Sequence, residues 1–119
     1  MTEKKSKKIP KKIKVGPFDF SITSDKKSFD NYGLKVKDLE AVGYTDDQQL
    51  NIHIAPGLSP GAEREVCLHE TFHAMYYLMG LDLALGPDKE ELIVNAFGVA
   101  MLQVIRDNPG LIEYLQQKE

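Results

Sequence analysis

The chain reads His69-Glu70-Thr71-Phe72-His73 near its middle, and the rest of the sequence is organised around this stretch. On an α-helix, two residues four positions apart lie on one face, with their Cβ atoms about 5–6 Å apart. Two imidazoles at that spacing can reach one zinc ion, with Zn–N distances of about 2.0–2.1 Å. The carboxylate of Glu70 is turned by about 100° from His69, so it lies beside the metal position and is suited to accept a proton there.

The same pattern also arises by chance, in roughly one chain in two hundred of this length and histidine content. The competing interpretation is a pair of ordinary helix histidines. Three further features separate the two interpretations: a helix around the pattern, a third protein ligand, and a coordination position left open for water.

Composition limits the class of protein. The chain has 119 residues, of which 42% are hydrophobic, enough for one domain with a core. A single cysteine excludes a disulfide framework and fits a reducing compartment. The lysine-rich start lacks the apolar segment of a secretory signal, and the longest uncharged run, residues 92–105, is too short to span a bilayer. We therefore expect a cytoplasmic protein without membrane contact.

The charge is uneven. Residues 1–12 hold six lysines against one glutamate, for +5, and the net charge of −3 leaves −8 for the rest. We expect residues 1–12 to form a disordered basic tail and residues 13–119 to form the folded domain. The alternative is that the tail binds an anionic partner such as nucleic acid. The absence of aromatic residues among the lysines and the acidic remainder make that partner less favoured.

Apolar periodicity predicts a small sheet. Apolar residues alternate with polar ones through residues 13–22, which predicts one half-buried strand with a kink at Gly16-Pro17. Two further apolar segments, residues 39–44 and 50–55, flank the turn residues 45–48 and predict an antiparallel hairpin. The same alternation places His53 on the polar face of its strand, where we expect a surface residue rather than a metal ligand.

Helix signals follow. Ser59 and Pro60 are typical of a helix start, and Gly80 is typical of a left-handed helix end, so the His-Glu motif lies on a helix over residues 60–79. A second helix is predicted over residues 88–106 and a short third one after Pro109. The sequence thus predicts an α+β fold, in which a small antiparallel sheet packs on the motif helix and a second, glutamate-bearing helix lies beside it.

The second helix offers the third ligand. Glu90 and Glu91 stand at its start, and consecutive residues point about 100° apart. Glu91 shares a face with Asn95, which could support a metal ligand by a hydrogen bond, so Glu91 is the favoured ligand and Glu90 is expected to be a solvated first-turn carboxylate. The alternative for Glu91 is a capping box closed with Asp88.

The motif His69-Glu70-x-x-His73, followed by Glu91-x-x-x-Asn95-x-Phe97, resembles the gluzincin metallopeptidases. Among these, residues 43–103 look most like the small ImmA/IrrE-type intracellular peptidases of bacteria and phages, which also have a strand shortly before the active helix. The resemblance implies a minimal zincin-like domain in which His69, His73 and Glu91 bind zinc.

The resemblance also implies an activity. A metallopeptidase of this type hydrolyses peptide bonds through a zinc-activated water, with Glu70 as the general base, and often acts on one specific intracellular protein. We expect the strand of residues 50–55 to pair with an extended peptide substrate. Tyr76, Tyr77 and His53 are the candidates for stabilising the oxyanion.

The alternative is a non-catalytic module, in which zinc stabilises the small core and the surface binds a partner protein. The unliganded carboxylate of Glu70 argues against it, because a structural zinc site does not use one.

Overall fold

The computed structural model describes residues 8–25 and 42–118, and its first two strands come from the alternating segment near the N-terminus. Strands β1 (Lys12–Val15) and β2 (Phe18–Thr23) pair antiparallel across a turn at Gly16 and Pro17. Gly16 has a φ of 59°, a conformation that glycine adopts at no steric cost. The single kinked strand predicted from the sequence is therefore a hairpin.

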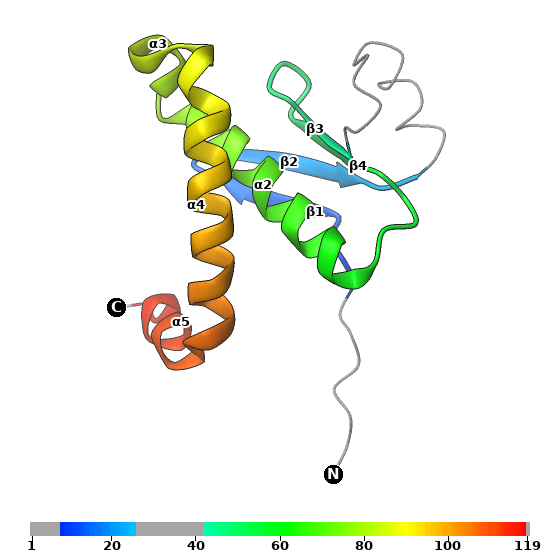
Figure 1. Ribbon diagram of the computed structural model, residues 1–119, viewed down its shortest axis with the longest axis vertical. Helices are drawn as coiled ribbons and strands as arrows, with labels where there is room; N and C mark the ends of the chain where they lie inside the picture. Colours follow the sequence, from blue (N-terminus) through cyan, green and yellow to red (C-terminus); the bar gives the residue numbers. More distant parts are fainter. Residues whose placement is uncertain (1–7, 26–41, 119) are drawn as a thin grey trace.

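The predicted hairpin is present, but the sheet is mixed rather than wholly antiparallel. Strands β3 (Gly43–Asp46) and β4 (Asn51–Ile54) pair antiparallel, whereas β4 pairs parallel with β2, so that the strand order is β1-β2-β4-β3 (Figure 1). This order puts β4, the most buried strand, inside the sheet. The predicted segment 39–44 is described only from residue 42.

The helices lie close to their predicted bounds. Helix α2 (Pro60–Leu78) begins at Ser59, whose Oγ accepts a hydrogen bond from the Ala62 backbone N at 3.3 Å. It is followed by Gly80 in the left-handed conformation, as predicted. The short helix α3 (Leu81–Leu85) connects α2 to α4 (Pro87–Asp107), and α5 (Pro109–Gln116) follows α4.

The core lies between α2 and one face of the sheet. Its buried apolar side chains come from three strands and the helix, namely Val15, Phe20, Ile22, Ile52, Ile54 and Ala74. The helix face that meets them carries residues 67, 70, 74 and 78, at the spacing of successive turns. The His-Glu motif is therefore fixed by packing, because Glu70 and Ala74 belong to the face that lies on the sheet.

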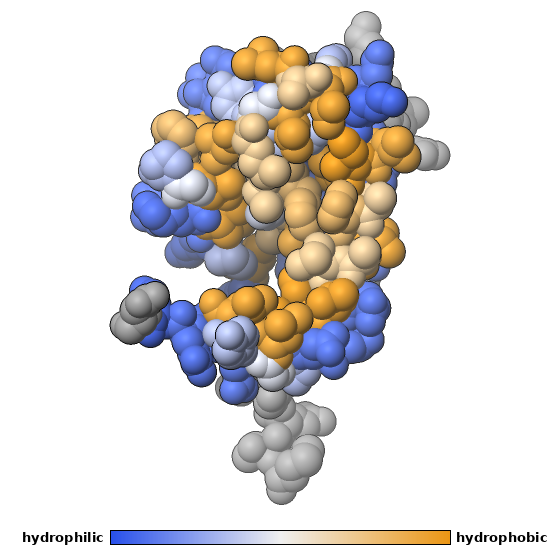
Figure 2. All heavy atoms as spheres, turned by 90° about the vertical axis from the view of Figure 1, so that its left-hand side faces the viewer, coloured by the Kyte–Doolittle hydropathy of each residue, from blue (hydrophilic) through white to orange (hydrophobic). Residues whose placement is uncertain are grey.

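A second face of α2 meets α4, which crosses it and extends past the sheet (Figure 1). Val94 is the buried residue of α4 at this crossing. The part of α4 away from α2 leaves many apolar side chains exposed, as the orange surface in Figure 2 shows. None of the helices in the described part of the chain is long and apolar enough to cross a membrane.

The folded domain begins earlier than predicted. Ile9 packs against the core, the backbone O of Lys11 accepts a hydrogen bond from Ile22 N at 2.8 Å, and Lys12 belongs to β1. The predicted boundary between residues 12 and 13 is therefore wrong, because the apolar Ile9 and the pairing of β1 extend the sheet towards the N-terminus. Residues 1–7 of the predicted tail lie outside the described part of the chain.

Candidate metal centre

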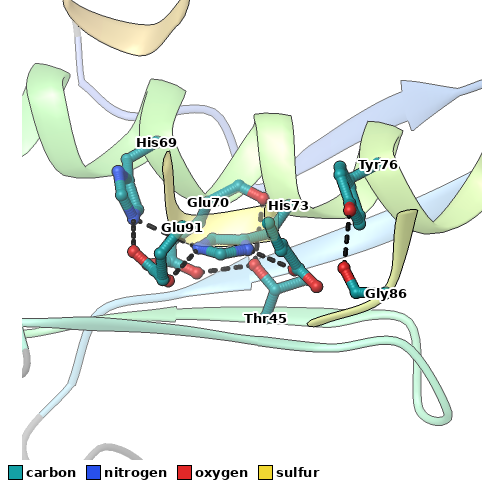
Figure 3. Close-up of polar contacts among 8 residues, drawn as sticks. Thr45, His69, Glu70, His73, Tyr76, Gly86 and Glu91 are labelled. Atoms are coloured by element: carbon teal, nitrogen blue, oxygen red, sulfur yellow. Dashed lines mark hydrogen bonds and ion pairs between the residues drawn. The ribbon is translucent and has the colours of Figure 1, made fainter. Parts of the chain in front are cut away.

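His69 and His73 lie on the flank of α2 that is adjacent to its core-facing side. Their four-residue spacing brings the two Nε2 atoms to 3.2 Å from each other (Figure 3). Burial lowers the pKa of His69, and the neighbouring His73 lowers it further. A lowered pKa favours the neutral imidazole, which is the form that offers a lone pair to a metal.

Glu91 reaches both histidines from the start of α4. Its Oε1 is 2.9 Å from His73 Nε2, and its Oε2 is 3.7 Å from His69 Nε2 (Figure 3). The structure thus brings together the three residues that the sequence predicts as ligands. Gly86 is the N-cap residue of α4 and provides no side-chain hydrogen bond. The side chain of Glu91 points to the histidines instead of closing a capping box.

Glu90 differs from its prediction. Instead of being solvated, its carboxylate contacts the other ring nitrogen of the same histidine, with 2.5 Å between Glu90 Oε2 and His73 Nδ1. The reason lies in the helix register: Glu90 shares a face with the buried Val94 and therefore faces α2. A carboxylate on Nδ1 fixes the tautomer and orientation of the ring, as metal-binding histidines require.

Asn95 also differs from its prediction. Its side chain is exposed, and among the described residues no hydrogen bond joins it to His69, His73 or Glu91. Asn95 does line the cleft beside the site. The support expected from Asn95 is therefore supplied by Glu90, on the opposite ring nitrogen.

The donor atoms fit a tetrahedral cation. Zinc bound at about 2.0–2.1 Å from each ligand separates tetrahedral donor atoms by about 3.3 Å. The three separations observed between the two Nε2 atoms and the Glu91 oxygens are 2.9, 3.2 and 3.7 Å.

Glu70 is buried beside this cluster and faces β3. His69, Glu70 and His73 each place a potential ligand atom within 4.8 Å of the others. Thr45 Oγ1 lies 2.7 Å from Glu70 Oε1 and 2.9 Å from its backbone O, so the hydroxyl holds the carboxylate in place. Burial raises the pKa of Glu70, and the Thr45 hydrogen bond opposes that rise. A raised pKa brings a carboxylate closer to the range of a general base at neutral pH.

An open cleft of about 1120 Å³ adjoins the histidines and Glu91. Its walls are β3, the motif face of α2 and the length of α4 from Glu90 to Asp107. Asp47, after β3, also lines it, and burial together with nearby Glu90 raises the pKa of Asp47 to about 6. From the sequence, Thr45 and Asp47 are predicted only as turn residues. The glycine before them, Gly43, was the available sign that a side chain approaches this strand closely.

The three oxyanion candidates are not among the residues that line this cleft. Tyr76 OH donates to the backbone O of Gly86 at 2.8 Å and so ties α2 to the start of α4 (Figure 3). His53 is only 3% exposed, and its Nδ1 is 2.9 Å from Thr23 Oγ1 on the neighbouring strand β2. The prediction of His53 as a surface residue is therefore wrong.

The expected substrate-pairing strand is also different. The strand of residues 50–55 is β4, which already pairs with β2 and β3 and has no open edge. Within the described sheet, β3 is the edge strand next to the cleft, where Gly43, Tyr44 and Thr45 are lining residues.

Searches of the chain against models of known protein families, against curated proteins and against solved structures found no match. The residues and geometry of the site are therefore the basis for assigning a function.

Proposed function

We propose that this protein is a zinc-dependent metallopeptidase of the gluzincin type, similar to the small ImmA/IrrE-type peptidases. His69, His73 and Glu91 would hold the zinc ion, and Glu70 would act as the general base. The observation that carries the proposal is the convergence of three side chains from two helices, whose two Nε2 atoms and two carboxylate oxygens lie 2.9–3.7 Å apart in the three contacts between residues, with the buried Glu70 carboxylate beside them. A structural zinc site has no use for such a carboxylate.

The residues divide the chemistry between them. When bound, zinc supplies Lewis acidity and makes water a stronger acid at neutral pH. Glu70 accepts the proton of the attacking water and returns it to the leaving amine. Thr45 holds the Glu70 carboxylate by its 2.7 Å hydrogen bond, and Glu90 holds the ring of His73. Glu70 and His73 therefore each have a partner that fixes their position before the substrate arrives.

The substrate would be a protein segment bound in an extended conformation. The cleft is open and runs along the edge strand β3, whose backbone groups can pair with such a segment. By resemblance, the substrate is a specific intracellular protein, which favours a cytoplasmic enzyme. The strand proposed to pair with the substrate is therefore β3, instead of the strand of residues 50–55 expected from the sequence.

The test uses the zinc-loaded protein and a library of peptides, with cleavage read by mass spectrometry. We expect Glu70→Gln to retain zinc and to lose cleavage by about 10²–10⁴-fold, since an amide keeps the shape but accepts no proton. Glu63→Gln is the matched control, because Glu63 lies on α2 about two helix turns before Glu70, and this variant should cleave like the wild type.

Two outcomes would contradict the proposal. Cleavage by Glu70→Gln at the wild-type rate would remove Glu70 from the mechanism. A zinc-loaded wild type that cleaves no peptide or protein substrate would favour the non-catalytic, zinc-stabilised interaction module instead.

A further inference from the structure

Helix α4 is apolar on more sides than its own chain covers. Between residues 92 and 105 its only polar side chains are Asn95 and Gln103. Helix α2 covers α4 at Val94, yet Leu92 is 66% exposed and Val99 is 76% exposed on other sides. A helix that is hydrophobic all round is normally buried on all sides. The uncovered side of α4 is therefore a surface that a partner can bury.

The uncovered side forms a stripe that we call the outer stripe of α4, made of Leu92, Ala96, Val99 and Gln103. These residues are spaced by four, three and four positions, and all four are exposed. The side chain of Gln103 also donates a hydrogen bond from Nε2 to Asp107 Oδ2 at 2.8 Å. This is the spacing at which two helices pack side by side. Figure 2 shows the apolar surface continuing from α4 onto its neighbours, where Leu83 and Leu85 of α3 and Leu111, Tyr114 and Leu115 of α5 are exposed.

Charged residues border the outer stripe at both ends. Asp88 and Arg106 are 18 positions apart, which is five full helical turns of about 3.6 residues, so they lie on the same flank. Lys89 and Asp107 are also 18 positions apart and share the other flank. Each flank thus carries an acid near one end of the helix and a base near the other.

We propose that a second copy of this chain covers the outer stripe, with the two α4 helices packed antiparallel about a two-fold axis. The two-fold axis keeps each flank on its own side and reverses the helix direction. Asp88 therefore meets Arg106 of the second copy, and Lys89 meets Asp107 of the second copy. Residue pairs whose numbers sum to about 195 face each other, so that Ala96 lies against Val99 of the second copy, close to the axis.

The flanking helices fit the same arrangement. Helix α3 stands at the start of α4 and α5 at its end, so antiparallel packing places α3 beside α5 of the second copy. The exposed leucines of α3 then lie opposite the exposed apolar side chains of α5 of the second copy. A membrane surface is the less suitable occupant, because membrane-binding helices carry an excess of Lys and Arg, whereas these four flanking charges sum to zero.

The pairing also bears on the cleft. Val99 and Gln103 belong to the outer stripe and line the cleft as well. A second copy on the stripe would therefore form an outer wall of each cleft. The pairing itself requires no metal, so it is independent of the proposed peptidase activity.

The experiment measures the mass of the full chain by light scattering and sedimentation over a range of concentrations. We expect a dimer of about twice the 13.4 kDa chain mass. Ala96→Glu, at an exposed position, should weaken the dimer by more than about 100-fold, since it brings two unpaired carboxylates together at the axis. Lys14→Glu on β1 is the control and should leave the dimer intact.

A charge exchange tests the orientation. Arg106→Glu should weaken the dimer about tenfold, because it places like charges together in two symmetric contacts. Adding Asp88→Arg in the same chain should restore the affinity to within about threefold of the wild type. A monomer at every concentration, a dimer that tolerates Ala96→Glu, or a double variant no better than Arg106→Glu alone would overturn the proposal. Vesicle binding by a monomeric chain would overturn it as well.

Discussion

Two consecutive glutamates, Glu90 and Glu91, contact different nitrogens of His73. Glu91 faces Nε2 and Glu90 faces Nδ1, because one residue step along α4 turns the side chain by about 100°. The sequence predicts Glu91 as a ligand because it shares a face with Asn95, although Asn95 makes no hydrogen bond to His69, His73 or Glu91 among the described residues. The sequence could not assign Glu90, because the contact depends on how α4 is rotated against α2, and that rotation is set by the burial of Val94.

Replacing these two glutamates separately distinguishes their roles. We expect Glu90→Ala to weaken zinc binding about 10–100-fold, the usual effect of losing a group that orients a metal-binding histidine. Glu91→Ala should weaken it more, because a ligand itself is lost. Zinc titration with a competing chelator measures both. A Glu90→Ala protein with wild-type affinity would show that the contact with His73 does not support the site.

Asp47 predicts a pH dependence of stability. Its pKa is about 6 in the folded protein, raised by burial and by Glu90, against about 3.9 in an unfolded chain. The folded state therefore keeps a proton that the unfolded state has lost between about pH 4 and 6, and folding loses stability as the pH rises through that range.

Asp47→Asn removes the group that titrates. In metal-free protein we expect the variant to melt higher than the wild type at pH 7.5 and to show a smaller difference at pH 4.5. Thermal unfolding at the two pH values measures this. Added zinc should reduce the difference, because a nearby cation favours the carboxylate. An equal difference at both pH values would mean that Asp47 does not titrate in this way.

At the scale of elements, β3 can lie close to Glu70, the proposed general base, because Gly43 has no side chain. A Cβ at Gly43 would lie 2.7 Å from Val66 Cγ1 and 2.8 Å from Glu70 Oε2. The close approach of α2 to β3 therefore requires glycine here, and it lets Thr45, two residues on, reach Glu70 on the same face.

Gly43→Ala should therefore destabilise the protein by about 1–3 kcal/mol, as overpacking does, and should lower cleavage by shifting Glu70. Gly98→Ala is the control, since a Cβ there meets nothing within 4 Å. In a helix interior that change should stabilise by about 0.5–1 kcal/mol. Chemical denaturation measures both. Equal effects at the two positions would show that β3 and α2 are not tightly packed at Gly43.

The elements that the sequence predicted well are those set by local chemistry. Ser59 and Gly80 mark the ends of α2, and the predicted turn residues 45–48 mark the β3–β4 hairpin, although β3 extends to Asp46 and the turn covers residues 47–50. The parallel pairing of β2 with β4 was not predictable in this way, since Ile22 and Ile52 are 30 positions apart and their pairing depends on packing. The burial of His53 was missed for the same reason.

At the scale of the whole molecule, the candidate metal site lies between two helices, α2 and α4. α2 carries His69 and His73 and packs on the sheet, while α4 carries Glu91 and meets the rest of the chain mainly through α2. Zinc held between them would link α4 to the α2–sheet unit. Zinc binding should then also raise stability, because a ligand that binds only the folded state stabilises it by mass action.

The most direct test is the metal content and metal position of protein purified without added zinc. Elemental analysis should find about one zinc per chain, and anomalous scattering at the zinc edge should place it between His69, His73 and Glu91. The variant with both His69→Ala and His73→Ala should contain none. Wild-type protein that contains no zinc and takes up none on titration, or a zinc peak away from these three residues, would contradict the account.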